Sequence, residues 1–370
     1  MNTLLVTATG ESTGKTAVAV ALGRLAQARG RSVGYMKPKG TRLQSHVGKT
    51  LDRDPMLARE LLGTDDEMHE MEPIVYSPTF VRSAMEGREA PADLRERVRE
   101  GFDAVREGRD FVVVEGGGRL TTGGVVDLTD AEVADLLDAE VALIADYESP
   151  PDIDDTLAAA RRLGDRLVGV VFNRVADAAS DEVESVVAPF LESKGIPVVG
   201  VLPREPDLAG VTVAELADEL GVEALTDAPT DGVVERFLVG AMSGEEALRF
   251  FRRTKSAAVI TGGDRTDIHT AALEAPGVTC LVITGGRRPP GTILGKAAEK
   301  GVPVLLSSAD TLSTLERAEE VIRSGRTRDE HTVDVMASLL TEHADVDALI
   351  GADAGSSADD GDDDAGDDGA

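Results

Sequence analysis

The first 29 residues constrain the fold more than any other stretch of the chain. A short apolar run at 4–8 leads into Thr-Gly-Glu-Ser-Thr-Gly-Lys-Thr at 9–16, and an Ala/Leu-rich helical pattern at 17–29 follows at once. Strand, small-residue loop and helix in this order are typical of a phosphate-binding loop, because backbone amides in the loop and at the helix N-terminus attract an anion. The sequence therefore predicts a P-loop.

The loop departs from the usual spacing at one position. In G-x-x-x-x-G-K-[ST] the first glycine would fall on Thr9, whereas here it is Gly10. The order of the surrounding parts still favours a P-loop over a chance small-residue loop at a strand end. We expect Lys15 at the outer phosphates and Thr16 at Mg²⁺. The residues predicted to bind the nucleotide here are Thr9, Gly10, Glu11, Ser12, Thr13, Gly14, Lys15 and Thr16.

The chain is strongly acidic, with 68 Asp and Glu against 38 Lys and Arg and a net charge of −30. Because 42% of the 370 residues are hydrophobic, about two folded domains are still expected, with the acidity on their surface. Such a surface indicates a halophilic source with a salt-rich cytoplasm. It argues against nucleic acid and anionic membranes as partners, since we find no block of clustered Lys and Arg.

Other global features favour a cytoplasmic protein. The single cysteine, Cys280, lies in an apolar run and is expected to be a buried structural thiol. The first residues lack a basic signal-like segment, and no apolar run is long enough to span a bilayer.

Apolar runs alternate with helical patterns along most of the chain. The all-apolar run 111–114 is typical of a strand buried on both faces, and further runs follow at 140–145, 167–172 and 196–202. This alternation predicts an α/β fold with a doubly wound, mostly parallel sheet. We predict a P-loop domain at 1–222, a second, smaller α/β domain at 233–325, a last helix around 333–340 and a disordered acidic tail at 351–370.

Charged residues at two predicted strand ends are candidates for the P-loop site. Lys37 and Lys39 follow the strand at 32–36, where ligands of open α/β sheets bind; a basic surface turn is the alternative. Glu115 ends the run at 111–114, where P-loop proteins commonly place an acid that holds the metal or its water. The alternative there is a solvated strand end.

Two further candidates have an equally good structural alternative. Asp54 precedes Pro55 at the start of a helical pattern, so it is either the cap of that helix or a metal ligand. Asn173 lies where a strand meets its loop. Its amide can contact an adenine edge, but a turn-forming Asn explains the position almost as well.

In the second domain, two strands end in Thr-Gly-Gly, which lets the backbone turn tightly or approach a ligand closely. Asp264 and Arg265 either pair with each other or contact that ligand. The residues predicted to bind it are Thr261, Gly262, Gly263, Asp264, Arg265, Gly285 and Gly286.

The first part of the chain resembles dethiobiotin synthetase and its relatives. The resemblance is carried by the loop at 9–16, Tyr-Met-Lys-Pro at 35–38, Asp54, Val-Val-Glu-Gly-Gly-Gly at 113–118 and Asn173. In that family the displaced loop glycine is ordinary. The resemblance implies ATP and Mg²⁺, with Lys15 and Thr16 at the phosphates, Asp54 and Glu115 at the metal, Lys37 facing the substrate and Asn173 near adenine.

The second part resembles a DRTGG domain through the segments 240–243, 260–265 and 283–286. Together with Val-Leu-Pro-Arg at 201–204, this order resembles the non-catalytic N-terminal region of long bacterial phosphate acetyltransferases. Since only an acidic tail follows residue 350, we expect no acetyl transfer by this chain alone.

Two functions follow as hypotheses. The first is an ATP/Mg²⁺-binding regulatory protein whose DRTGG domain senses a ligand or mediates oligomerisation, linked to phosphate acetyltransferase and acetyl-CoA metabolism. The second is an ATP-dependent carboxylate or carbamate ligase of the dethiobiotin synthetase type, with Lys37 orienting the substrate. The Gly/Thr stretch at 119–126 lacks the aromatic residue and proline expected of a synthetase, which favours regulation. Enzymatic activity, the ligand of the second domain and homo-oligomerisation stay open.

Overall fold

The computed structural model describes residues 2–41, 43–46, 49–205, 208, 210–324 and 330–352, which form two compact units. One unit comprises the described chain through Pro203 together with the described residues from Glu330 onward. The other comprises the described residues from Arg204 to Ser324. Most of the predicted acidic tail, from residue 353 on, lies outside the described residues.

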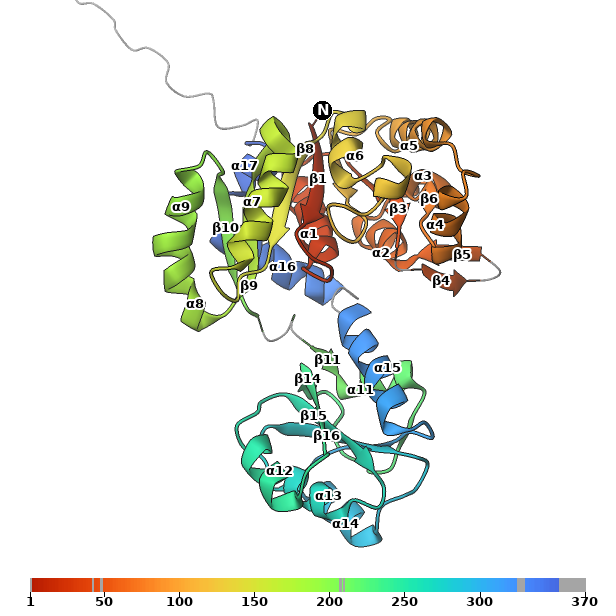
Figure 1. Cartoon of the computed structure of the whole chain (residues 1–370), viewed down its shortest axis with the longest axis vertical. Coiled ribbons are helices and arrows are strands. Elements are labelled where there is room, and N and C mark those ends of the chain that lie inside the picture. The colour runs from red at the N-terminus through yellow and green to blue at the C-terminus, as the bar shows by residue number, and fades with distance from the viewer. Residues whose placement is uncertain are drawn as a thin grey trace, which may run out of the picture. The chain divides into compact units, whose positions relative to one another are not determined.

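A six-stranded parallel sheet forms the centre of the first unit, in the order β10-β9-β8-β1-β7-β2 (Figure 1). All five residues of β7 are buried, as a strand covered on both faces requires. The strands are β1 (Asn2–Ala8), β2 (Val33–Met36), β7 (Phe111–Glu115), β8 (Glu140–Ala145), β9 (Leu167–Val175) and β10 (Val198–Pro203). The predicted α/β fold with a mostly parallel sheet is confirmed.

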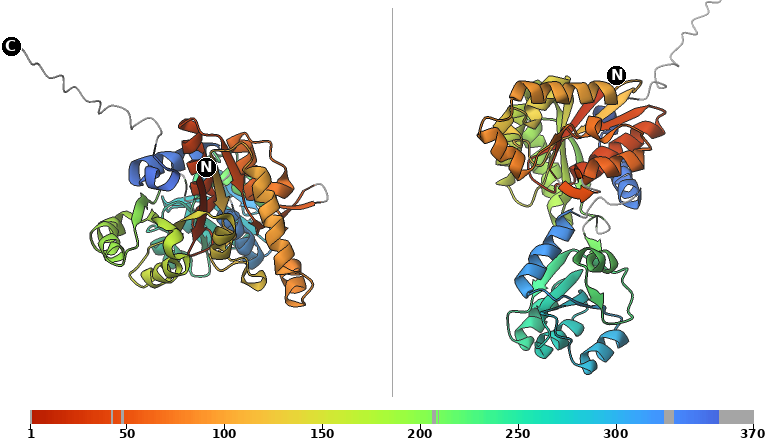
Figure 2. Two further views of the ribbon diagram at one scale, coloured as in Figure 1. Left: turned by 90° about the horizontal axis from the view of Figure 1, so that it is seen from above. Right: turned by 90° about the vertical axis from the view of Figure 1, so that its right-hand side faces the viewer.

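Helices cover both faces of this sheet (Figures 1 and 2). Helix α1 (Lys15–Ala28) packs on β1, β7 and β2, whereas α6 (Asp130–Leu137) packs on β1 and α7 (Asp152–Leu163) on β8. Right-handed connections explain the division, because the chain runs from β1 in one direction to β2 but from β7 in the other direction to β8. Helix α5 (Pro91–Val105) contacts α6, and α8 (Asp177–Glu182) and α9 (Ala188–Glu192) contact β10.

Shorter elements lie between β2 and α5. Strand β3 (Lys39–Gly40) pairs with β6 (Ile74–Val75), and β4 (Leu43–His46) forms an antiparallel pair with β5 (Lys49–Asp52). The helices of this segment are α2 (Arg53–Leu62), α3 (Met68–Met71) and α4 (Pro78–Met85).

The predicted last helix exists, and it completes the first unit. Helix α16 (Glu330–His343) packs on α1 and β10, and α17 (Val346–Ile350) packs on α1, β1, β9 and β10. Two arginines just after α1 hold the end of α17: Arg29 donates to the carbonyl of Gly351 at 3.0 Å and Arg31 to that of Ala352 at 3.1 Å. The second unit is therefore inserted into the first between β10 and α16.

The second unit is a smaller α/β domain, as predicted. Its sheet has the order β12-β17-β16-β15-β14, in which β12 (Glu223–Ala224) is antiparallel to β17 and the other pairings are parallel. The parallel strands are β14 (Arg236–Val239), β15 (Ala257–Gly262), β16 (Val278–Thr284) and β17 (Val304–Leu306). Residues of α12 (Gly244–Phe251), α13 (Thr266–Leu273) and α14 (Gly291–Glu299) belong to one core cluster; those of α11 (Val213–Leu220) and α15 (Thr311–Ser324) belong to another.

The two units divide at residue 204, whereas we expected the first domain to end at 222 and a linker to lead to the second domain at 233. The reason is that the segment before the linker packs into the second unit: β11 (Val211–Thr212) pairs with β13 (Val233–Val234), and Leu216 of α11 lies in one of its cores. Part of the predicted linker is also ordered, since it contributes the edge strand β12. The polar residues of that stretch therefore belong in part to a strand at the edge of the sheet.

We predict that Leu340→Ala in α16 lowers the free energy of unfolding of the first unit by about 2–5 kcal/mol, since Leu340 is fully buried. The chain has no tryptophan, and its three tyrosines, Tyr35, Tyr76 and Tyr147, all lie in the first unit. Tyrosine fluorescence during urea unfolding therefore reports on this unit. The control is Val186→Ala in the same unit, because Val186 is 59% exposed and its truncation should leave stability nearly unchanged. Equal stability of the Leu340 variant and the parent would contradict the assignment of α16 to this core.

Candidate functional site

The loop at 9–16 joins β1 to α1 and has the backbone of an anion cradle. Gly14 has φ +95°, and a Cβ there would lie 2.4 Å from the amide nitrogen of Asn173, so the position admits only glycine. Helix α1 begins with no side-chain cap and no acid in its first turn. Its first amides are thus available for an anion, where the helix dipole adds positive potential.

The predicted nucleotide-binding residues take different places in this loop. Thr9 donates its amide to the carbonyl of Ile144 in β8 at 3.1 Å, and Ser12 has a left-handed backbone, with φ +53°. Glu11 is exposed and lies 3.5 Å from Arg119. The hydroxyl of Thr13 is buried without a hydrogen-bond partner among the described residues. That unsatisfied donor fits a loop that binds phosphate oxygens.

Lys15 and Thr16 start α1 and are both buried. The ammonium of Lys15 lies back over the loop, 3.4 Å from the carbonyl of Gly10. The hydroxyl of Thr16 donates to Oε1 of Glu115 at 2.8 Å. Parallel pairing explains this contact, because Val6 of β1 lies opposite Glu115 at the end of β7, just before the loop. Glu115, predicted from its strand end alone, therefore meets the P-loop.

Lys37 and Asp54 join the same cluster. The ammonium of Lys37 donates to Oδ2 of Asp54, and it lies 2.9 Å from Oδ2 of Asp52 and 3.7 Å from Oε1 of Glu115. Tyr35, two residues earlier in β2, donates its hydroxyl to the other oxygen of Glu115. These side chains are buried, so the cluster is shielded from solvent. The structure brings together the four residues predicted for metal and substrate, Thr16, Lys37, Asp54 and Glu115.

The cap of α2 distinguishes the roles of two neighbouring aspartates. Asp52 is the N-cap residue, and its Oδ1 accepts the amide of Asp54 at 2.8 Å. Asp54 therefore does not cap this helix, and its carboxylate is directed to Lys37. Sequence reasoning missed Asp52, although it lies two residues before Asp54 in the same Asp-Arg-Asp-Pro segment.

Burial and mutual charge shift the pKa values in this cluster. Burial raises the pKa of Glu115, against the attraction of Lys37. Burial by itself would lower the pKa of Lys37, but the charges of Asp54, Glu115 and Asp52 outweigh it and raise that pKa above its usual value. Desolvation and the same carboxylates raise the pKa of Tyr35 well above its usual value. Both shifts favour a charged Lys37 and a neutral Tyr35 near neutral pH.

Lys39 serves a structural purpose. Its buried ammonium donates to the carbonyls of Leu128 and Thr122 and pairs with Asp130 at 2.9 Å. Asp130 also accepts the hydroxyl of Thr7 at 2.6 Å. The pair holds the loop after β7 in place, so neither predicted alternative for Lys39, a ligand contact or a surface turn, describes it. Sequence reasoning also missed Asp130. The one feature that could have pointed to it is its position as the first residue of α6.

Glu72 is a buried carboxylate behind this site that the sequence did not single out. Its Oε2 accepts the amide of Asp52 at 2.8 Å, whereas its Oε1 is buried without a hydrogen-bond partner in the described part of the chain. A Cβ on Gly40 would lie 1.8 Å from this Oε1, so Gly40 is needed for their close approach. Burial raises the pKa of Glu72 to about 7.

Asn173 braces the P-loop. Its Nδ2 donates to the carbonyl of Thr13 at 2.8 Å, and its Oδ1 accepts the amide of Arg174 at 2.9 Å. The side chain is only 3% exposed. The strand-end asparagine therefore has a structural partner in the loop, and its contact with adenine stays a prediction.

In the second unit the two Thr-Gly-Gly segments lie against neighbouring backbone. A Cβ on Gly263 would lie 1.9 Å from the carbonyl of Arg287, and Gly285 and Gly286 have φ +76° and +67°. Arg265 donates to the carbonyls of Gly240 and Met242 and pairs with Asp267 rather than with Asp264. Close packing thus accounts for Gly263, and the positive φ angles account for Gly285 and Gly286. Ligand binding by 261–265, Gly285 and Gly286 stays a prediction.

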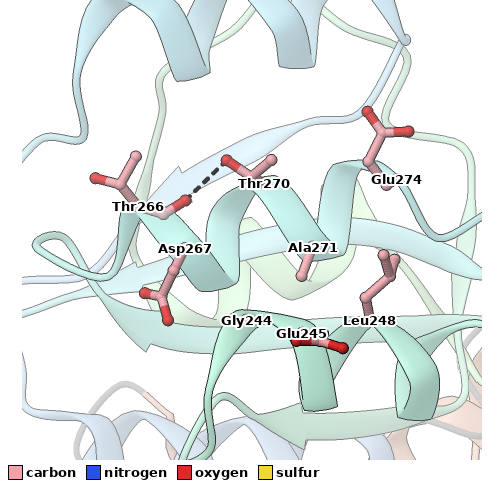
Figure 3. Close-up of a pocket in the computed structure, with 8 residues that line it drawn as sticks. All are labelled: Gly244, Glu245, Leu248, Thr266, Asp267, Thr270, Ala271 and Glu274. Carbon is pink, nitrogen blue, oxygen red and sulfur yellow. Dashed lines mark hydrogen bonds between the residues drawn. The ribbon is translucent and has the colours of Figure 1, made fainter.

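A groove of about 500 Å³ lies in the second unit between α12 and α13 (Figure 3). Its wall carries three carboxylates, and each has a basic neighbour: Glu245 pairs with Arg249, Asp267 with Arg265 and Glu274 with Lys296. The lining residues are Gly244, Glu245, Leu248, Thr266, Asp267, Thr270, Ala271 and Glu274. The groove holds no reactive cluster, and none of the predicted ligand residues lines it.

Across the described residues, no group of three or more His, Cys, Asp or Glu is arranged to hold a metal ion. The P-loop cluster offers a smaller set of hard oxygen donors, the carboxylates of Asp54 and Glu115 and the hydroxyl of Thr16. This set fits Mg²⁺, which proteins usually hold through one or two carboxylates together with substrate phosphates and water. It does not fit a soft-metal site, which needs thiolate or imidazole.

A family model described as an AAA domain, AAA_26, matches residues 2–212. The chain belongs to this family. A DRTGG domain matches residues 215–321. The resemblance to a P-loop domain joined to a DRTGG domain is therefore confirmed. Within the described parts of the chain, no helix combines the length and apolar character needed to cross a bilayer.

Curated relatives show the same two parts. The chain is 25% identical to phosphate acetyltransferase of Nitratidesulfovibrio vulgaris, over 93% of this chain and 50% of the relative. It is 24% identical to that of Pseudomonas putida, over 93% and 51%. ATP-dependent dethiobiotin synthetase BioD of Methanocaldococcus jannaschii is 29% identical over 31% of this chain and 52% of the relative. The chain thus spans about half the length of the curated relatives it matches.

Two solved structures show weaker similarity. The CBS and DRTGG domains of the regulatory region of Clostridium perfringens pyrophosphatase, complexed with the activator diadenosine tetraphosphate, align over 45% of this chain and 85% of that one, with 17% identity and a TM-score of 0.29. MinD of Aquifex aeolicus aligns over 56% and 84%, with 16% identity and a TM-score of 0.34.

We predict that Glu72→Gln changes the pH dependence of stability. The pKa of Glu72 is about 7 in the folded chain and near 4.5 when it is exposed, so the folded state binds the proton more tightly. Stability from this group is present below about pH 4.5 and is lost as the pH rises through 7. The variant should match the parent near pH 5 and be more stable by about 2–3 kcal/mol near pH 8. Urea unfolding at both pH values measures this.

The control for Glu72→Gln is Glu140→Gln at an exposed position, which should leave the pH profile unchanged. A difference between the Glu72 variant and the parent that stays constant from pH 5 to pH 8 would contradict the raised pKa.

Proposed function

We propose that the P-loop unit binds ATP with Mg²⁺, and that the DRTGG unit senses a small ligand or mediates self-association, so that the protein regulates phosphate acetyltransferase and acetyl-CoA metabolism. The contact that carries the proposal is the hydrogen bond from Thr16 to Glu115 at 2.8 Å. It places a helix-start hydroxyl and a strand-end carboxylate together beside the phosphate-binding loop. P-loop NTPases hold Mg²⁺ with a Ser or Thr of the loop and an acid from a neighbouring strand.

The loop itself supports phosphate binding. Gly14 allows the backbone to turn towards α1, and the uncapped first turn supplies amide donors. The buried hydroxyl of Thr13, which has no hydrogen-bond partner in the part of the chain that the structure describes, adds another donor. We assign the outer phosphates to Lys15, whose ammonium lies over this loop.

We assign Mg²⁺ to Thr16, Asp54 and Glu115, the oxygen donors that lie together beside the start of α1. When bound, the ion would neutralise charge on the phosphate oxygens. The protein's own residues supply the rest: Lys15 and the loop amides orient the phosphates, and burial of the carboxylates excludes competing water. The acidic surface indicates that binding is best measured in concentrated KCl.

The relatives support the regulatory half of the proposal. The similarity to phosphate acetyltransferases extends over 93% of this chain and includes both units. The match to dethiobiotin synthetase covers only 31% of it. Because both the P-loop unit and the DRTGG unit are shared with phosphate acetyltransferases, we favour a role in acetyl-CoA metabolism. A nucleotide site and a separate ligand site on two units are also what coupling between ligands requires.

We expect Lys15→Ala to weaken ATP binding by about tenfold to a hundredfold, because a charge-assisted hydrogen bond to phosphate is lost. Isothermal titration calorimetry with ATP and Mg²⁺ in concentrated KCl measures it. Lys296→Ala is the matched control, since Lys296 pairs with Glu274 on the surface of the second unit. Equal ATP affinity of the parent and the Lys15 variant would contradict the nucleotide site.

A ligase of the dethiobiotin synthetase type is the second candidate, favoured by the meeting of Lys37 with Asp54 and Glu115. The regulatory proposal predicts that diaminopelargonic acid leaves ATP hydrolysis unchanged. Steady-state phosphate release with and without this compound measures it. Stimulation that Lys37→Ala abolishes, while Lys296→Ala preserves it, would establish the ligase and overturn the regulatory proposal.

A further inference from the structure

The ammonium of Lys37 is shared among three carboxylates. It hydrogen-bonds to Asp54, lies 2.9 Å from Asp52 and lies 3.7 Å from Glu115. All four side chains are at most 5% exposed. A buried charge of this kind is stable only when an opposite charge compensates it. Lys37 is thus the counter-ion of the acids to which we assign the metal.

The three carboxylates differ in how the protein holds them. Asp52 is fixed by the backbone, because its Oδ1 accepts the amide of Asp54 at 2.8 Å and its Oδ2 accepts the amide of Thr41 at 2.7 Å. Glu115 is held by hydroxyls, those of Thr16 and Tyr35. We assign the cation to Asp54 and Glu115 rather than to Asp52, because both carboxylate oxygens of Asp52 are bonded to backbone amides.

We propose that Lys37 and a divalent cation compete for the carboxylates of Asp54 and Glu115, and that Asp52 retains the lysine when the cation binds. The proposal rests on the proposed metal site and adds its regulation. Two like charges cannot share the same buried oxygens without strong repulsion, since Coulomb energies rise steeply where water is excluded. Metal binding then changes the partners of Lys37 at the end of β2, the edge where a second ligand would meet the nucleotide.

The test titrates the nucleotide-free protein with Mn²⁺, a paramagnetic substitute for Mg²⁺, and measures free Mn²⁺ by electron paramagnetic resonance in concentrated KCl. Lys37→Met removes the charge and keeps an unbranched apolar side chain. We expect this variant to bind Mn²⁺ about tenfold or more tightly than the parent, because the competing cation is gone. Arg166→Met is the control for net charge: Arg166 pairs with Asp135 and Asp138 beside the start of β9, and its loss should leave Mn²⁺ affinity unchanged.

If Lys37→Met does not fold in metal-free buffer, circular dichroism provides a second test. We then expect Mn²⁺ to restore the fold of the variant at Mn²⁺ concentrations lower than those needed to saturate the parent protein. Equal or weaker Mn²⁺ binding by the folded variant, no binding by either protein, or no recovery of the fold would each overturn the competition. ATP calorimetry separates this from the proposed function. If Lys15→Ala weakens ATP while Lys37→Met leaves Mn²⁺ affinity unchanged, the nucleotide site stands and only the competition fails.

Discussion

The hydrogen bond between Thr16 and Glu115 is the contact on which the site depends. It ties the first turn of α1 to the end of β7, two elements about a hundred residues apart in the chain. The parallel pairing of β1 with β7 allows this contact, because both strands end at the same edge of the sheet. Lys37 reaches the same edge from β2, the next strand. Three adjacent strands thus bring the loop, Glu115 and Lys37 to one buried cluster.

The energetics of this cluster are those of a buried polar network. Lys37 with its three carboxylates, and Lys39 with Asp130, are desolvated pairs whose members depend on each other. The two lysines are separated by one residue, yet they have different roles: Lys37 pairs with three carboxylates, and Lys39 fixes the loop after β7. Glycines allow this density, since a Cβ on Gly116 would lie 2.1 Å from a carboxylate oxygen of Asp130.

The second unit is inserted into the chain of the first unit. The described residues that follow it, 330–352, return to the first unit and pack on α1, the helix that begins at the P-loop. The inserted domain is therefore connected at both ends to elements of the P-loop unit. In that domain the Thr-Gly-Gly segment at 261–263 is explained first by packing, since Gly263 approaches a neighbouring backbone and Arg265 satisfies two carbonyls.

The sequence by itself determined the local and periodic features: the P-loop, the alternation of strands and helices, the α/β class of both units and the last helix. It also indicated Glu115 and Lys37 as functional, because a charged residue at the end of a buried strand has few other reasons to be there. Only the tertiary structure decided which residues meet. Asp52, Glu72 and Asp130 were not singled out, since their roles come from burial beside partners 15 to 123 positions away. Residues 330–350 likewise carry a helical pattern, which specifies that these helices have an apolar face. Which part of the protein covers that face is decided only by packing over the whole chain.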